Sequence, residues 1–166
     1  MAKVNPSKEF IQLVTDAQGI IHKVCAIYCS DRELRKDLFQ EILIQLWKSY
    51  PSFKHRAKFS TWMYRVSLNV ALQYVRKEQR KPLEVEFSGA LGDLSAEEGD
   101  DHYEEELQLL HAAIAQLNDV EKAIVMLYLE DKSNDEIAEI IGISQNYVRV
   151  KMNRAKTKLK KILNTQ

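Results

Sequence analysis

The stretch that decides the fold reads SNDEIAEIIGISQNYVRVKMNRAKTKLKK over residues 133–161. It begins with a capping box, in which the Ser133 hydroxyl and the Glu136 carboxylate can satisfy the orphan amides at a helix start. Gly142 permits the tight turn that ends this helix, and Ser144 can cap a second one. The second helix repeats its apolar residues at spacings of four and three: Val148, Met152, Ala155, Leu159 and Ile162. The stretch therefore predicts a helix-turn-helix.

The other faces of the second helix carry cations and amides, which favours DNA as the partner. No carboxylate occurs from Ile143 to Gln166. Arg149 can bind guanine bidentately and an amide side chain can bind adenine, each discriminating by about 1–3 kcal/mol, whereas lysines meet phosphates without reading sequence. The alternative is an ordinary basic helix face that is exposed to water and binds no partner. The residues predicted to contact DNA are Gln145, Asn146, Arg149, Val150, Lys151, Asn153, Arg154, Lys156 and Lys158.

The charge of the chain is strongly segregated although its total is zero. Residues 1–82 hold 15 Lys and Arg against 7 Asp and Glu, residues 83–106 hold 10 acids and no base, and residues 107–166 hold 9 bases against 7 acids. Two basic modules are thus joined by an acidic segment. Because the distribution of charge sets the electrostatic footprint, the zero total does not exclude nucleic acid.

Apolar periodicity predicts helices and no strand, so the expected fold class is all-α with two small domains. One helix is expected from Phe10 to Tyr28, a second over 34–47 that ends before Pro51, and a third over about 61–81. The third is expected to turn Trp62, Val66, Val70 and Tyr74 toward the core. The predicted domains are 1–82 and 107–166, joined by a flexible linker over 83–106 that spans roughly 25–30 Å as a coil.

Composition bounds the class of protein. A chain of 166 residues with 45% apolar and 29% charged residues fits a soluble globular protein. No apolar run approaches the length of a membrane span and no signal-peptide core begins the chain, so we expect no membrane insertion and a cytoplasmic location. Cys25, Cys29 and His22 loosely suggest a metal site; a fourth ligand is missing, which favours buried thiols. No catalytic residue and no cofactor are expected, since no P-loop, nucleophile elbow or His-containing triad occurs.

Three blocks, in this order, resemble bacterial RNA polymerase sigma factors of the extracytoplasmic-function type. They are DLFQEILIQLW over residues 37–47, FSTWMYRVSLN over residues 59–69, and the helix-turn-helix from Glu136 to Ala155. The resemblance implies a transcription initiation factor that binds core RNA polymerase, directs it to promoters and assists melting, without catalysing a bond change. Implied partners are the polymerase clamp helices, double-stranded and melted promoter DNA, and an anti-sigma factor; the free protein is expected to be a monomer.

The resemblance also implies roles for particular residues. Docking on the polymerase is assigned to Asp37, Leu38, Phe39, Gln40, Glu41 and Trp47, of which Leu38 is expected to pack inward together with Ile42 and Leu46. Recognition and melting of the −10 element is assigned to Lys54, Arg56, Lys58, Phe59, Ser60, Thr61, Trp62, Arg65, Asn69, Arg76 and Lys77, and the second helix of the helix-turn-helix to the −35 element. The mixture of cations and aromatic rings in the stretch 54–62 is typical of single-stranded DNA binding, where rings stack on bases. Trp62 is also a candidate for the core, because it shares a face with Val66 and Val70.

Three rival classes stay open at this point. A stand-alone helix-turn-helix regulator explains residues 133–161 and leaves the blocks at 37–47 and 59–69 unexplained. An enzyme lacks any recognisable catalytic constellation. A protein that only occupies the polymerase would fit if the basic helix were inert toward DNA.

Overall fold

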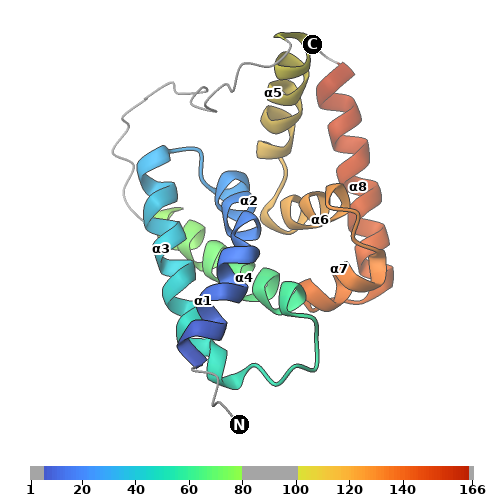
Figure 1. Ribbon diagram of the computed structural model, residues 1–166. Coiled ribbons are helices and arrows are strands. Elements are labelled where there is room, and N and C mark those ends of the chain that lie inside the picture. The colour runs from blue at the N-terminus through green and yellow to red at the C-terminus, as the bar shows by residue number, and fades with distance from the viewer. Residues whose placement is uncertain (1–5, 80–100, 165–166) are drawn as a thin grey trace. The chain divides into compact units, whose positions relative to one another are not determined.

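A computed structural model describes residues 6–79 and 101–164, and every regular element in these two ranges is helical (Figure 1). The predicted all-α class is therefore confirmed. Contacts divide the chain into two compact units, one holding 6–29 and 33–79 and the other holding 30–32 and 101–164. The elements are α1 (Pro6–Asp16), α2 (Gln18–Tyr28), α3 (Arg32–Ser49), the 3₁₀ helix η1 (Tyr50–Ser52), α4 (Phe59–Gln79), α5 (Asp101–Ala115), α6 (Asp119–Leu129), α7 (Asn134–Ile141) and α8 (Gln145–Asn164).

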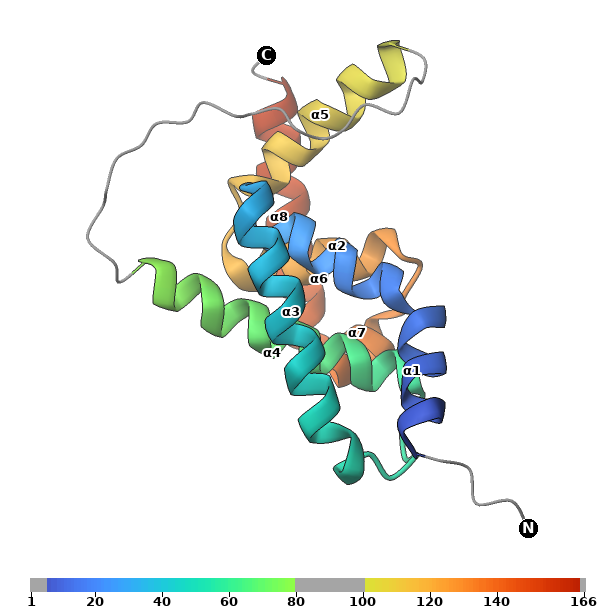
Figure 2. The same cartoon turned by 60° about the vertical axis from the view of Figure 1, so that its left-hand side comes forward.

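In the first unit, α2 packs against both α1 and α4, and α3 completes the bundle (Figure 2). The buried face of α3 consists of Leu38, Ile42 and Leu46, which are spaced by four residues and fully shielded from solvent. The Nε of Arg35 donates a 2.7 Å hydrogen bond to the Cys29 carbonyl, which ties the end of α2 to α3. A helix with one apolar stripe leaves its opposite face free for other contacts.

The single helix predicted from Phe10 to Tyr28 is in fact two. The backbone leaves helical geometry at Ala17, where φ is −110° and ψ is 11°. The Ile20 amide bonds to the Ala17 carbonyl only three residues back, which interrupts the helical ladder. Gly19 lies in this turn and lowers helix propensity by about 1 kcal/mol relative to alanine. The break changes the chain direction while both helices keep apolar residues inward.

The buried face of α4 also differs from the prediction. Trp62, Val66 and Val70 are only half-buried, whereas Tyr74 is buried as expected. The core face is instead rotated toward Met63, Tyr64, Ser67, Leu68 and Ala71. The cause is a competing aromatic partnership, described below, that holds Trp62 at the edge of the core.

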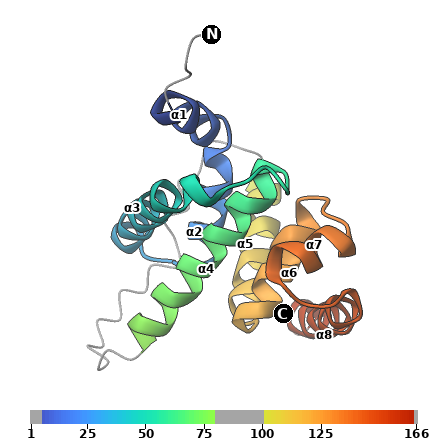
Figure 3. The same cartoon turned by 90° about the horizontal axis from the view of Figure 1, so that it is seen from below.

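In the second unit, α5, α6 and α7 all pack against α8 (Figure 3). The predicted caps at Ser133 and Ser144 and the turn at Gly142 are confirmed, while the Glu136 carboxylate accepts a 3.2 Å hydrogen bond from the Ser133 hydroxyl. The Ser133 hydroxyl accepts a 3.2 Å hydrogen bond from the backbone amide of Glu136, and Gly142 ends α7 with a left-handed φ of 81°. The Ser144 hydroxyl accepts a 3.1 Å hydrogen bond from the backbone amide of Tyr147 and so caps α8. The helix-turn-helix therefore rests on caps and a turn that lie within a few residues of one another in sequence.

The last part of the linker predicted over 83–106 is helical. Helix α5 begins at Asp101, so residues 101–106 are helical and not part of a flexible tether. The remaining residues of the predicted linker, 83–100, lie outside the described residues.

The two cysteines are buried free thiols, as favoured above. Burial, with the neighbouring Cys29 thiol as a lesser cause, raises the pKa of Cys25 to about 12. His22 is exposed and its ring lies against Phe39 at 4.7 Å between centroids. Within the described ranges no group of three metal-ligating side chains comes together, so the loosely suggested metal site is not formed there.

Candidate nucleic-acid and polymerase interfaces

The outer face of α3 presents carboxylates and apolar side chains together. Asp37, Gln40 and Glu41 are exposed, and Trp47 is 51% exposed although its indole contacts the Phe10 ring at a centroid distance of 5.2 Å. Helical spacing places these four side chains opposite the buried stripe. Such a face combines an aromatic side chain, a type that is enriched at the cores of protein interfaces, with charged groups of the kind found at the polar rim.

Leu38 packs inward, as expected for this residue of the docking motif. Its side chain is fully buried beneath α3, so it cannot touch a partner. Phe39 is half-buried against His22, so only part of its ring is available to contact a partner. Ile44, which the sequence analysis did not select, is 54% exposed in the middle of the outer face. The sequence signal for Ile44 was an apolar residue one helical turn after Gln40, outside the buried stripe of Leu38, Ile42 and Leu46. We call the set Asp37, Gln40, Glu41, Ile44 and Trp47 the α3 outer face.

The loop before α4 is organised around four aromatic rings. Phe53 is central: its ring lies 6.4 Å from Tyr50, 5.8 Å from Phe59 and 5.1 Å from Trp62. Phe59 and Trp62 also contact each other at 5.4 Å. All four rings are half-buried, so each keeps part of its surface accessible. We call Tyr50, Phe53, Phe59 and Trp62 the aromatic cluster.

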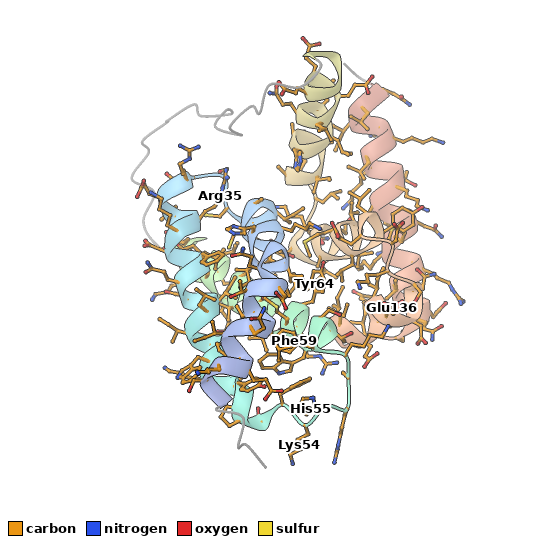
Figure 4. All side chains as sticks on the ribbon, viewed as in Figure 1. Arg35, Lys54, His55, Phe59, Tyr64 and Glu136 are labelled. Atoms are coloured by element: carbon orange, nitrogen blue, oxygen red, sulfur yellow. The ribbon has the colours of Figure 1, made fainter. Side chains whose placement is uncertain are left out.

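Cations surround the aromatic cluster. Lys54, Arg56 and Lys58 are all exposed on the loop that leads into Phe59, and Figure 4 shows Lys54 reaching outward from it. The His55 ring lies tilted against the Phe53 ring at a centroid distance of 4.6 Å, and His55 adopts a φ of 56°, a left-handed conformation that few non-glycine residues take. Exposed cations beside accessible ring faces form the arrangement that single-stranded nucleic acid binds.

A polar stripe continues from the cluster along α4. Arg65, Asn69 and Arg76 are exposed and follow Trp62 at helical spacings of three, four and seven residues, which puts all four on one face. Lys77 is exposed beside them. The stripe lies opposite the buried Met63–Ala71 face, so the same helix supports the core and presents the cations. Ser60 is half-buried at its start.

Thr61 was predicted to contact DNA and does not have the surface to do so. It is only 7% exposed, one of three buried polar or charged side chains among the described residues. Its position in the first turn of α4, between the half-buried Ser60 and Trp62, turns it toward the core.

The outward side of α8 matches the predicted recognition surface. Asn146, Arg149, Val150 and Asn153 are exposed, and they lie opposite the buried Val148, Met152 and Ala155. Arg154 is exposed beside them. Helix α8 is amphipathic, and its buried face packs on the other helices of the second unit. The amides and the guanidinium on the opposite face of its first three turns suit the major groove of DNA.

Two of the lysines predicted to contact DNA, Lys151 and Lys156, and the side-chain amide of Gln145 already have partners within the protein. The Lys151 ammonium lies 5.4 Å from the centre of the Tyr147 ring, and the Lys156 ammonium lies 4.8 Å from that of Tyr128. Both tyrosines are exposed and neither was selected from sequence. The Gln145 amide nitrogen donates to an Asp135 carboxylate oxygen at 2.7 Å.

Lys158 is engaged by a buried carboxylate. Its ammonium donates to Glu121 Oε1 at 2.7 Å, and Glu121 is 1% exposed while the lysine side chain is 52% exposed. The second carboxylate oxygen, Oε2, is buried without a hydrogen-bond partner. The predicted phosphate contact of Lys158 is therefore misplaced, because its charge is already neutralised within the protein.

Comparison with known families identifies both units. The family model "Sigma-70 region 2" matches residues 13–81, and the model "Sigma-70, region 4" matches residues 107–159. The ECF RNA polymerase sigma-E factor of Escherichia coli K12 is 29% identical over 160 residues, covering 90% of this chain and 83% of its own. The corresponding factor of Haemophilus influenzae is 28% identical with similar coverage, 90% and 84%. A probable RNA polymerase sigma factor, RfaY, of Xanthomonas campestris is 22% identical, and the chain spans 38% of its length.

Solved structures agree on the fold. The sigma factor RpoE of Bartonella quintana, in complex with the anti-sigma factor NepR, aligns with a TM-score of 0.75 at 21% identity, covering 95% of this chain and 98% of that chain. CnrH, in complex with the cytosolic domain of CnrY, aligns with a TM-score of 0.70 at 18% identity, covering 96% and 90%.

A stand-alone helix-turn-helix regulator does not explain the N-terminal match to region 2. Sigma factors are regulators and not enzymes as a class. No helix in the described ranges is both long and apolar enough to cross a membrane. With region 2 followed by region 4 and sigma-E factors among its relatives, the chain belongs to the sigma-70 family, as a transcription initiation factor of the extracytoplasmic-function type.

Proposed function

We propose that the three surfaces divide the work of initiation among them. The α3 outer face binds the clamp helices of core RNA polymerase, the aromatic cluster and the α4 stripe capture and open the −10 element, and α8 reads the −35 element. The two units act as the domains 1–82 and 107–166, joined across 83–106. The observation that carries the proposal is the aromatic cluster ringed by exposed cations on the unit that also holds the α3 outer face.

Polymerase docking rests on the composition of the α3 outer face. Its two carboxylates, Asp37 and Glu41, suit a basic partner surface, and Ile44 with Trp47 supplies apolar area that water otherwise covers. Buried aromatic anchors at an interface commonly dominate its affinity. The proposed contact therefore combines a charge pair at the rim with an apolar centre.

Promoter melting rests on the aromatic cluster and Asn69. A flipped base loses its stacking partners at a cost of a few kcal/mol, and stacking on an accessible ring returns about 1–3 kcal/mol. Asn69 lies two helical turns after Trp62 on the same face, where its amide can hydrogen-bond a base edge. Arg65, Arg76 and Lys77 hold the phosphates.

Reading of the −35 element rests on the outward side of α8. Arg149 and the exposed amides there can make bidentate contacts to bases, and Arg154 adds a phosphate contact. Two weak DNA contacts on one chain reinforce each other, because the second becomes effectively intramolecular. An anti-sigma partner, a cytoplasmic site of action and a monomeric free state complete the proposal; the solved relatives RpoE and CnrH are both in complex with other proteins, NepR and the cytosolic domain of CnrY.

The docking proposal is tested by co-elution of the full chain with bacterial core RNA polymerase. The double variant Asp37→Ala/Glu41→Ala is expected to elute largely free of the polymerase. Glu105→Ala/Glu106→Ala on α5 is the matched control, because it removes the same charge from exposed positions of the second unit. Equal retention of both variants would place the docking surface elsewhere.

The melting proposal is tested by comparing Asn69→Ala with Gln73→Ala, an exposed polar residue one turn along α4. Permanganate oxidation of unpaired thymines measures opening, and co-elution measures recruitment. Asn69→Ala is expected to reduce opening while recruitment stays unchanged. Opening equal to that of the wild type would remove Asn69 from the proposed pocket.

A further inference from the structure

The first residue of the recognition helix is held by a residue of the preceding helix. Gln145 opens α8 and Asp135 lies in the first turn of α7, ten positions earlier in the chain. Both side chains are exposed on the same side of the turn, and the Gln145 Nε2–Asp135 Oδ1 distance is 2.7 Å. This is the length of a short, charge-assisted hydrogen bond. The pair lies at the border of the proposed DNA surface and not in the core.

The carboxylate decides which way the amide points. A carboxylate oxygen only accepts hydrogen bonds, so the amide atom that faces Asp135 must be the nitrogen and not the oxygen of Gln145. A flipped amide would bring two acceptor oxygens together. Gln145 is therefore left with a fixed pattern: one N–H that is still free to donate and an oxygen that is free to accept.

That pattern is complementary to adenine. In the major groove, adenine presents the N7 acceptor beside the N6 amino donor, which one N–H and one oxygen can satisfy together. Guanine presents two acceptors, N7 and O6, and would require both N–H groups of the amide, one of which Asp135 already holds. Thymine offers an acceptor and a methyl group, and cytosine offers a donor alone.

We propose that Asp135 is a positioning residue for promoter specificity: by holding the Gln145 amide in one orientation, it makes the start of α8 select adenine over guanine in the −35 element. The proposal rests on the placement of α8 in the DNA groove proposed above. Asp135 touches no base in this scheme. Its negative charge also favours this arrangement, because it repels a phosphate from the position that the amide occupies.

The experiment uses the full chain bound to bacterial core RNA polymerase and a pool of duplex DNA randomised across both promoter elements. Bound DNA is recovered and sequenced. For the wild type, one position of the upstream element is expected to favour adenine over guanine by about tenfold, within the range of a good bidentate contact. Asp135→Ala is expected to bring adenine and guanine close to equality there, and Gln145→Ala to abolish the preference.

Two further variants separate the orientation of the Gln145 amide from a general effect on folding. Asp135→Asn keeps the shape of the side chain, but its amide can donate as well as accept, so it no longer fixes the Gln145 amide and should lose much of the adenine preference. The double variant Asp135→Ala/Gln145→Ala should select DNA as Gln145→Ala does. Full adenine preference in Asp135→Ala, or a double variant that departs from Gln145→Ala, would overturn the proposal.

Arg149→Ala distinguishes this failure from failure of the proposed function. If Arg149→Ala changes the selected upstream bases while Asp135→Ala does not, α8 reads the DNA and only the role of Asp135 is refuted. If neither variant changes the selected bases, the placement of α8 in the groove is refuted and the role of Asp135 with it.

Discussion

Loss of the Lys158 ammonium should destabilise the second unit more than loss of any solvated lysine on α8. Lys158→Met leaves the carboxylate of Glu121, which is 1% exposed, with neither oxygen paired. Breaking a fully buried pair costs roughly 3–5 kcal/mol, and an unsatisfied buried polar group costs about 1–3 kcal/mol. Because the lysine side chain is 52% exposed, water reaches the pair from one side, and we expect about 2–3 kcal/mol.

The matched control is Lys160→Met, an exposed position on the same helix that should change stability by no more than about 0.5 kcal/mol. The double variant Glu121→Met/Lys158→Met should recover most of the loss, since apolar side chains of similar volume replace a buried pair at little cost.

Urea unfolding followed by far-UV circular dichroism reports on all the helices. Tryptophan fluorescence reports on the first unit, because Trp47 and Trp62 are the only tryptophans and both lie there. The expected result is a shift of the dichroism transition in Lys158→Met. If Lys158→Met unfolds like Lys160→Met, the buried pair does not hold α8 against α6 and the reasoning is wrong.

Three further outcomes follow from single positions. Gly142→Ala should lower stability by about 1 kcal/mol in the same urea assay, because φ at that position is 81° and a side chain is strained there whatever the space. Ile44→Ala should weaken co-elution with core polymerase and leave the urea midpoint unchanged, since the side chain is 54% exposed in the free protein. Stability should fall as the pH rises from about 8.5 toward 12, because an unfolded thiol ionises near 8.5 while the pKa of Cys25 in the fold is raised to about 12; Cys25→Ala should flatten this dependence, measured by urea unfolding at several pH values.

Local signals made the helix-turn-helix predictable. The Ser133–Glu136 cap, the Gly142 turn and the Ser144 cap each join groups only a few residues apart, and all three occur in the structure. The apolar period of α8 likewise places Val148, Met152 and Ala155 in the core. Caps and periodicity depend on the neighbouring residues alone, so a sequence can report them without knowledge of the fold.

Helix faces were harder to orient than helices were to find. Leu38 in the docking motif is buried as expected, whereas Thr61, which was assigned to DNA contact, is unexpectedly buried as well. A motif identifies the segment that performs a task, while the rotation of the helix decides which of its residues reach the surface. In α4 that rotation is coupled to the contact of Trp62 with Phe53, which lies outside the helix, so no period within α4 encodes it.

The amino-acid sequence by itself determined the class of this protein and its all-α fold, and it marked the segments that we propose to meet polymerase and DNA, because these follow from local periodicity, caps and motif order. Only the tertiary structure decided which charges are free to act. Lys158 and Glu121 are 37 positions apart, and Gln145 and Asp135 are held together across a turn. The partner of a charged side chain depends on how the helices pack, and that packing brings together residues that the linear chain keeps apart.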